Sequence, residues 1–461
     1  MQSNPTQSID ACDVVLVSCY ELGHEPLGVL TPAGVIERAG LNARVVDVAM
    51  DDFDPASVND VPLVAISTPM HTALRLGTRV AARVRELNPG AHICFFGLYA
   101  ELHRGHLLGS LADSCLGAEF ENDLLMLTRA IRDRGPVPAR SISPAAPREA
   151  HATRERALDL APRRAPVSGA TRYARLHHQG EFLATGYVAA TRGCKHLCMH
   201  CPIPAAYDGR FYALPVEQVL ADLDAVVAHG ARHITFADAD FLNGPTHALR
   251  IAREMHRRHP GVTFDYTAKI EHLLQHPGVV DELQSLGNIF VVSAVESFND
   301  DVLMKLAKGH TVRDAITVIR AFHARGLTLR PSLMPFNPWE TRESLARLFE
   351  IVAEEELVPC IDPVQYTIRL LLPAGSLLLR EPDVAALAGP FDSERFTHSW
   401  RHPDPAMDAI QEELAAMASE SVAAPASETF LRMAAVAAPG RVLRISGHRG
   451  VSPRLTEDWF C

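Results

Sequence analysis

The strongest constraint on the fold of this chain is an alternation of short apolar strands and amphipathic helices, which occurs in two series. In the first series, strands are predicted at residues 13–18, 43–48, 63–67 and 92–97, with helices at 31–38 and 73–86. This alternation predicts a parallel, doubly wound sheet, in which ligands bind at the carboxyl ends of the strands. The candidate ligand loops are therefore residues 19–27, 67–72 and 97–100.

The second series begins near residue 173 and repeats the pattern about six times. Apolar positions at helical spacing predict helices, and short β-branched runs predict the strands between them. The expected helices are 215–229, 245–259, 279–286, 312–325 and 342–356, and the later strands are 263–267, 289–296, 328–333 and 364–371. A partial (β/α)6 barrel is the natural closure, with its site at the carboxyl ends of the strands.

The whole chain is thus expected to be α/β, in four parts: a doubly wound domain over 1–133, a Pro/Arg-rich linker over 134–172, a partial barrel over 173–379 and a mostly helical extension over 380–461. A net charge of −11 gives no global attraction to nucleic acid or anionic membrane. No apolar run reaches the length of a membrane span, and no signal-peptide pattern is present. Nine cysteines, an odd number, argue against a disulfide framework and favour a reducing cytoplasm.

Three cysteines lie close together after the first expected strand of the second series. Cys194, Cys198 and Cys201 form a C-x3-C-x2-C pattern, and flanking Gly193 and Pro202 indicate a loop. Thiolates at this spacing can converge on one metal centre. On a four-iron cluster, three thiolates leave one iron open to a substrate or cofactor.

Two alternatives remain open for this motif. His196 or His200 could join the cysteines around zinc, which prefers four ligands in a closed structural site. The cysteines could also be buried without any metal.

The cysteine motif, placed after a strand at the start of β/α units, resembles the radical SAM superfamily. In that family the three cysteines bind a 4Fe–4S cluster, and S-adenosylmethionine (SAM) chelates the fourth iron. The reduced cluster then cleaves SAM and yields a 5′-deoxyadenosyl radical. The residue before the third cysteine is usually aromatic in the family, and here it is His200.

The resemblance also implies contacts to SAM from residues at strand ends. Asp238 and Asp240 lie where the family binds the methionine amino group, and Ser293 and Glu296 belong to a Ser-Ala-Val-Glu-Ser run that is similar to a SAM-contacting G-I-E-S pattern. Arg369 could bind the carboxylate of SAM or of a substrate, or form a structural ion pair. No catalytic residue can be assigned.

The first series resembles the cobalamin-binding domains that precede many radical SAM cores. The ligand-exchanging type carries D-x-H-x-x-G, S-x-L and G-G, whereas this chain has His24 without that motif, Ser67-Thr-Pro and a single Gly97. Bound cobalamin is therefore left open, against a degenerate domain used for packing or substrate access.

Several stretches, including the ending Leu455-Thr-Glu-Asp-Trp-Phe-Cys461, resemble a subgroup whose members end in C-U-A-E-P or C-C-A-E-P, where U is selenocysteine. On this resemblance the tail is expected to be truncated after Cys461. The implied partners are a small-molecule or peptide substrate and an electron donor such as flavodoxin or ferredoxin. Methyl transfer with cobalamin is one expected outcome, and an iron–sulfur redox or sensor protein without SAM turnover is the alternative function.

Overall fold

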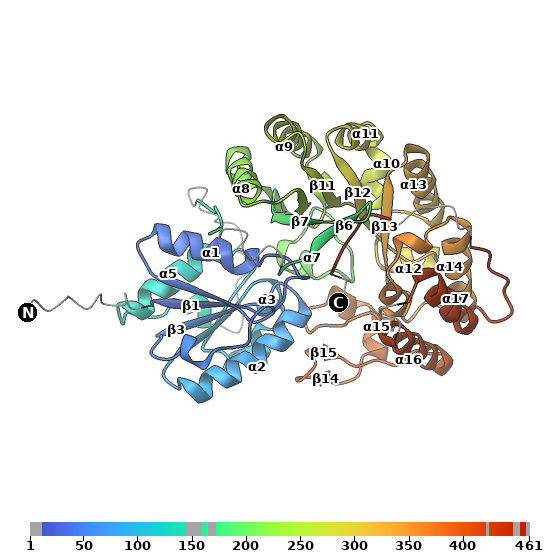
Figure 1. The fold of residues 1–461 in the computed structure, drawn as a ribbon. Helices are drawn as coiled ribbons and strands as arrows, with labels where there is room; N and C mark the ends of the chain where they lie inside the picture. Colours follow the sequence, from blue (N-terminus) through green and yellow to red (C-terminus); the bar gives the residue numbers. More distant parts are fainter. Residues whose placement is uncertain (1–11, 143–158, 165–171, 421–423, 446–451, 458–461) are drawn as a thin grey trace, which may run out of the picture. The chain divides into compact units, whose positions relative to one another are not determined.

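The computed structural model describes residues 12–142, 159–164, 172–420, 424–445 and 452–457. The chain divides into two compact units (Figure 1). The first comprises residues 1–165 and 393–396, and the second comprises 166–392 and 397–461. Cys461 and its neighbours lie outside the described residues, as do Arg148, Arg154 and Arg156 of the 134–172 stretch.

The first unit is built on a five-stranded parallel sheet in the order β2-β1-β3-β4-β5. Its strands are β1 (Val14–Ser18), β2 (Ala43–Asp47), β3 (Leu63–Ser67), β4 (His92–Phe96) and β5 (Ser114–Leu116). Its helices are α1 (Leu27–Arg38), α2 (His71–Leu87), α3 (Leu98–Leu102), α4 (Arg104–Leu107), α5 (Glu121–Arg132) and α6 (Ala139–Ile142). The strands β1 and β3 are buried at every position, which explains why they read as continuous apolar runs. The doubly wound sheet predicted from the sequence is confirmed.

The core of the second unit is a curled sheet in the order β13-β12-β11-β10-β7-β6-β16. The strands β7 (Glu181–Val188), β10 (His233–Phe236), β11 (Thr263–Thr267), β12 (Asn288–Glu296) and β13 (Thr328–Leu333) run parallel. The intervening helices are α8 (Val216–Ala228), α9 (Pro245–Arg258), α10 (Ile270–Gln275), α11 (Pro277–Ser285), α12 (Asp300–Lys305), α13 (Val312–Arg325) and α14 (Arg342–Glu354). Figure 1 shows α8, α9, α11 and α13 ranged around the outside of this sheet, as expected for a partial barrel.

The prediction of a sixth strand at residues 364–371 is wrong, because no regular strand forms there. A 3-10 helix occupies Pro363–Thr367, and its first proline cannot donate to a strand ladder. Only a short bridge follows, in which the Phe336 N–H donates to the Ile368 carbonyl and the Leu370 N–H donates to the Phe336 carbonyl. The barrel therefore has five full parallel strands and a vestigial sixth position in the described residues.

Two antiparallel additions extend the barrel on its other side. The strand β6 (Arg175–His178) forms a hairpin with β7, and β16 (Arg454–Leu455) then pairs with β6. Arg330 of β13 donates to the carbonyl of Pro453, just before β16, and forms an ion pair with Asp362. The C-terminal segment thus contacts both edge strands of the half-barrel.

The rest of the C-terminal extension is mostly helical, as expected, with α15 (Pro382–Leu387), α16 (Pro405–Glu420) and α17 (Ala426–Ala437) beside a short hairpin of β14 (Phe391–Asp392) and β15 (Thr397–His398). No helix in the described ranges combines the length and the hydrophobicity that crossing a bilayer requires.

Residues 159–164, from the Pro/Arg-rich stretch, pack within the first unit. Arg163 pairs with Glu37 at 2.6 Å, and Arg164 pairs with Glu25. Arg38 donates to the backbone carbonyl of Ala161, and Leu160 is buried. This part of the stretch is therefore held by ion pairs.

Candidate functional site

The three cysteines lie on one short loop at the carboxyl end of β7. The loop leaves the small strand β8 (Thr191–Gly193), which pairs with β9 (Phe211–Ala213), and it ends where Cys201 precedes α7 (Pro202–Tyr207). Gly193 has φ +74°, and a Cβ atom there would lie 2.5 Å from the Arg210 carbonyl. Only glycine fits this turn, which sends the chain from β8 into the loop.

The thiols of this loop are mostly buried. Cys194 and Cys198 are 9% and 7% exposed, and burial raises the pKa of the Cys201 thiol to about 12. The backbone amide of Cys201 donates to the Cys198 carbonyl, which keeps the loop compact. Because buried thiols of this kind resist ionisation, thiolates here require a nearby cation such as a metal.

The geometry does not favour the zinc alternative. A single zinc ion would draw its sulfur ligands to about 4 Å from one another. Among the His, Cys, Asp and Glu side chains of the described residues, one group of three has ligand atoms that all lie within 4.8 Å of one another: His196, Asp240 and His272. His196 faces His272, and His200 faces Glu296 at 3.3 Å, so neither histidine completes a set with the cysteines.

Asp238 and Asp240 follow β10, as predicted, and both are buried. One oxygen of Asp238 accepts a hydrogen bond from the Thr191 hydroxyl, and the other accepts from the Ala190 amide at 3.0 Å. Burial raises the pKa of Asp238 to about 6 against these bonds. Asp238 therefore holds the entrance of the cysteine loop.

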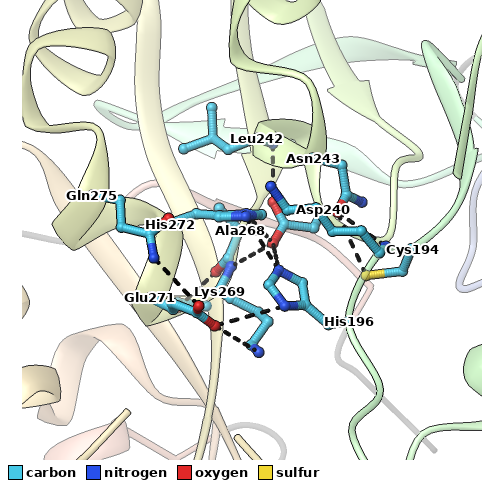
Figure 2. A network of polar contacts seen from close by, with 12 residues as sticks. Cys194, His196, Asp240, Leu242, Asn243, Ala268, Lys269, Glu271, His272 and Gln275 are labelled. Carbon is cyan, nitrogen blue, oxygen red and sulfur yellow. Dashed lines mark hydrogen bonds and ion pairs between the residues drawn. The ribbon is translucent and has the colours of Figure 1, made fainter. Parts of the chain in front are cut away.

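Asp240 is fully buried and contacts the ends of two strands (Figure 2). Its Oδ1 accepts from the Leu242 amide, and its Oδ2 accepts from the Lys269 amide at 3.1 Å and from His272 Nδ1 at 2.8 Å. His272 Nε2 in turn lies 3.2 Å from His196 Nε2 in the cysteine loop. Burial, followed by the charge of Lys269, lowers the pKa of His196 to about 4, so this ring is neutral at pH 7.

Glu296 lies at the end of β12 in a left-handed conformation, with φ +68°. Its Oε1 lies 3.2 Å from the ammonium of Lys308, which is only 2% exposed, and 3.3 Å from His200 Nε2. Burial alone would raise the pKa of Glu296, but Lys308 and His200 hold that pKa well below its usual range. A strained, buried, ionised carboxylate next to the cysteine loop is typical of a functional site.

The remaining predicted contacts have partners of their own. The Ser293 hydroxyl donates to the Ala268 carbonyl at 2.7 Å. Arg369 is held by Asp408 at 2.7 Å, by the Trp400 carbonyl and by stacking over the Trp400 ring. The structure thus shows the structural ion pair that sequence reasoning had left open for Arg369.

Several buried polar atoms around the cysteine loop have no partner within the described chain. They are Nδ2 of Asn243, Nδ1 of His200 and both ring nitrogens of His310. Asn243 Oδ1 accepts from the Lys195 amide and lies 3.8 Å from Cys194 Sγ. Unsatisfied buried donors are rare in folded proteins, and a group of them beside the cysteines fits a site that receives a polar ligand.

Sequence reasoning missed the polar partners of the strand-end acids. His196 and His200 were considered as zinc ligands, and no role in the site was predicted for Lys308, His272 or His310. The signal that could have found Lys308 is the proximity of a buried acid, because a buried carboxylate needs a cation.

In the first unit, Glu21 follows β1, and its carboxyl group and the Ser67 hydroxyl at the end of β3 both lie against Gly28. The Glu21 carboxyl group accepts from the Gly28 amide at 2.9 Å, at the start of α1, and burial raises the pKa of Glu21 to about 8. His24 is also buried. Gly97 has φ +104° and passes close to the backbone of Thr68, so its lack of a side chain is required there.

Comparison with known proteins finds similarity in the barrel region. Residues 188–349 match the family model described as the radical SAM superfamily. A 188-residue segment is 28% identical to the ribosomal protein uS12 methylthiotransferase RimO of Geobacter sulfurreducens, and covers 37% of this chain and 40% of that protein. The tRNA-2-methylthio-N(6)-dimethylallyladenosine synthase of Haemophilus influenzae is 22% identical over 185 residues, with 37% and 38% covered. The chain thus spans about 40% of the length of these curated relatives.

Solved structures share the fold over more of the chain. The cobalamin-dependent SAM radical enzyme OxsB, with aqua-cobalamin and SAM bound, superposes with a TM-score of 0.64 at 13% identity, over 92% of this chain and 70% of that chain. The radical SAM methyltransferase TsrM of Kitasatospora setae, with tryptophan and a SAM analogue bound, gives 0.62 at 16% identity, over 81% and 77%. The cysteine loop lies inside the region that matches the radical SAM superfamily model, and the chain shares its fold with these two enzymes.

Proposed function

We propose that this chain is a radical SAM enzyme that holds a 4Fe–4S cluster through Cys194, Cys198 and Cys201 and binds SAM at the carboxyl ends of the barrel strands. The observation that carries the proposal is the placement of three cysteines, of which Cys194 and Cys198 are buried, on one short loop inside the region that the family model matches. When bound, the reduced cluster would supply the electron that cleaves SAM into methionine and a 5′-deoxyadenosyl radical.

The chain's own residues support this cluster by charge and by hydrogen bonding. Lys308 is a buried cation beside the cysteine loop, and its positive charge lowers the pKa of Cys201 against the opposite effect of burial. Asn243 Oδ1 lies 3.8 Å from Cys194 Sγ, and the Nδ2 of the same amide has no partner within the described chain. The charge of Lys308 stabilises negative charge on sulfur, as cluster ligation requires.

The strand-end residues then divide into two roles. Asp238 and Asp240 have their oxygens occupied by the protein, and they shape the cysteine loop. Glu296, which lies 3.3 Å from His200 of the loop, offers an ionised carboxylate, and His200 and His310 offer unpartnered ring nitrogens; these are the side chains we assign to SAM. Ser293 contributes from the same strand by fixing the backbone at Ala268.

We further propose that the first unit binds cobalamin and that the reaction is a methyl transfer to an unactivated position of a small molecule or peptide. The fold shared with TsrM and OxsB supports this. Because the first loop lacks D-x-H-x-x-G, the protein is expected to bind cobalamin without a histidine ligand. Flavodoxin or ferredoxin would deliver the electron. Kinship with the C-U-A-E-P subgroup stays a prediction.

The test is anaerobic reconstitution of the wild-type protein and the triple Cys→Ala variant, followed by assays for iron, cobalamin and 5′-deoxyadenosine or S-adenosylhomocysteine. Wild-type protein should bind about four irons, retain cobalamin and consume SAM, and the variant should lose the iron. A cluster without SAM turnover would favour the redox or sensor alternative, and iron binding by the variant would refute the ligand assignment.

A further inference from the structure

One side chain between the first two cysteines connects the loop to the barrel. Lys195 and Leu197 are exposed, Leu197 to 54%, so they contribute little packing. His196 points inward, and its Nε2 lies 3.2 Å from His272 Nε2 at the start of α10 (Figure 2). His196 also lies 3.8 Å from Asp240 and 3.6 Å from Glu271, and the Lys195 amide donates to Asn243 Oδ1, so the His272 contact is the shortest that the His196 ring makes to the barrel.

The hydrogen bonds around His272 fix the direction of the contact. His272 Nδ1 faces the Asp240 carboxylate at 2.8 Å and must donate to it. In the tautomer that carries its proton on Nδ1, the opposite nitrogen of His272 is an acceptor, and it faces His196 Nε2 at 3.2 Å. The chain of bonds runs from the loop through two rings to a carboxylate at the end of β10.

Asp240 is an anchor that cannot easily move. It is fully buried, and besides His272 it accepts from the amides of Leu242 and Lys269. These two amides belong to the segments that follow β10 and β11. The loop is thus connected to two adjacent parallel strands at once.

The same three side chains could be read as a metal site, because their ligand atoms lie within 4.8 Å of one another. However, both Asp240 oxygens are already used by donors, and the ammonium of Lys269 lies 3.2 Å from Glu271, next to His196. A hydrogen-bonded link accounts for these contacts without an additional cation.

We propose that His272 is a positioning residue for the iron–sulfur centre: through His196 it fixes the part of the loop between Cys194 and Cys198. The proposal rests on the cluster assignment above, but its structural part applies equally to the protein without a cluster. It gives the buried Asp240 a function other than direct contact with SAM.

Three substitutions separate this role from a merely structural one. His272→Gln places an amide oxygen near the Nε2 position and keeps an acceptor for His196, whereas His272→Asn keeps only the bond to Asp240. His272→Ala removes both. His256→Ala, which removes a histidine bond to the Leu286 carbonyl elsewhere in the barrel, is the control.

The first readout is hydrogen exchange of peptides covering residues 194–201 in the cluster-free protein. Loss of one buried hydrogen bond should speed exchange there by roughly tenfold in His272→Ala and His272→Asn, with recovery in His272→Gln and no change in His256→Ala. The second readout is the EPR spectrum and reduction potential of the reconstituted cluster, which should change in the Ala and Asn variants and return toward wild type in Gln.

Unchanged exchange and an unchanged EPR spectrum in His272→Ala would overturn the proposal. Recovery in His272→Asn but not in His272→Gln would also overturn it. So would the finding that the wild-type chain binds one zinc ion in addition to its irons and that His272→Ala loses this zinc. If wild-type protein forms no cluster, the proposed function fails, while the exchange experiment still decides whether His272 positions the loop.

Discussion

The ion pair between Lys308 and Glu296 gives the sharpest quantitative prediction. Both side chains are buried, at 2% and 9% exposure, and their charged atoms lie 3.2 Å apart. Lys308→Met leaves the Glu296 carboxylate buried with only His200 beside it. Removing one partner of a buried pair typically costs about 3–5 kcal/mol, because the other charge stays desolvated. His200 compensates in part, so we expect the lower end of this range.

The double variant Lys308→Met/Glu296→Gln should be more stable than the sum of the single variants predicts. With both charges removed, neither desolvation penalty remains, and the coupling energy should be about 2–3 kcal/mol. Glu296 also has a left-handed backbone, which its contacts with Lys308 and His200 help to maintain.

Tryptophan fluorescence during urea unfolding is a suitable assay for this cycle. Every tryptophan of the sequence is numbered 339 or higher and falls outside the residue range of the first unit, so the signal reports on the second unit. Lys305→Met, which removes an exposed ion pair with Asp383, is the control and should change stability by less than about 1 kcal/mol.

The pH dependence follows from the same pair. The pKa of Glu296 is held below its usual value of 4.5, so its stabilising contribution is fully present above pH 4.5 and is lost as the pH falls through the folded-state pKa. Glu296→Gln should therefore weaken the acid sensitivity of the second unit. A coupling energy near zero, or acid sensitivity equal to wild type, would refute the reasoning.

Three further predictions concern other buried charges. Burial raises the pKa of Glu21 to about 8, so the first unit should lose stability as the pH rises from 4.5 to 8. Glu21→Gln should abolish this pH dependence, which hydrogen exchange of β1 would measure. An unchanged pH dependence in the variant would be contrary evidence. Arg369→Met should lower the melting temperature to a similar extent as Asp408→Asn, since the two side chains pair with each other. Titration should show that the variant's affinity for SAM is unchanged. Weaker SAM binding at unchanged stability would show that Arg369 has a role in binding. Arg330→Met breaks the hydrogen bond to the Pro453 carbonyl and the ion pair with Asp362, so it should release the C-terminal segment. The release would be seen as faster proteolysis between residues 440 and 456. Equal proteolysis rates in the variant and the wild type would count against a role of Arg330 in holding this segment.

The architecture was predictable from the sequence where the spacing of apolar residues matches the burial that the structure shows. The strands β1 and β3 are buried along their whole length, and their apolar runs made them recognisable. The segment 364–371 has the same apolar character, but Pro363 starts a 3-10 helix, and local sequence could not show that only one bridge to Phe336 forms.

For the site, the loop itself was predictable and its surroundings were not. The cysteine spacing and the strand-end acids are local patterns, and both lie where expected. The partners of those acids come from distant positions: His272 is 76 residues from His196, and Glu296 meets His200 across 96 residues. No periodicity encodes such contacts, because they depend on how the parallel strands bring their carboxyl ends together.

The central claim is that Cys194, Cys198 and Cys201 hold a cluster with one iron open to SAM. The most direct measurement is EPR of the anaerobically reconstituted, dithionite-reduced protein with and without SAM, with 5′-deoxyadenosine assayed in the same samples. We predict a 4Fe–4S signal that changes when SAM is added, together with consumption of SAM. A cluster signal indifferent to SAM, or zinc bound with no iron signal, would contradict the account.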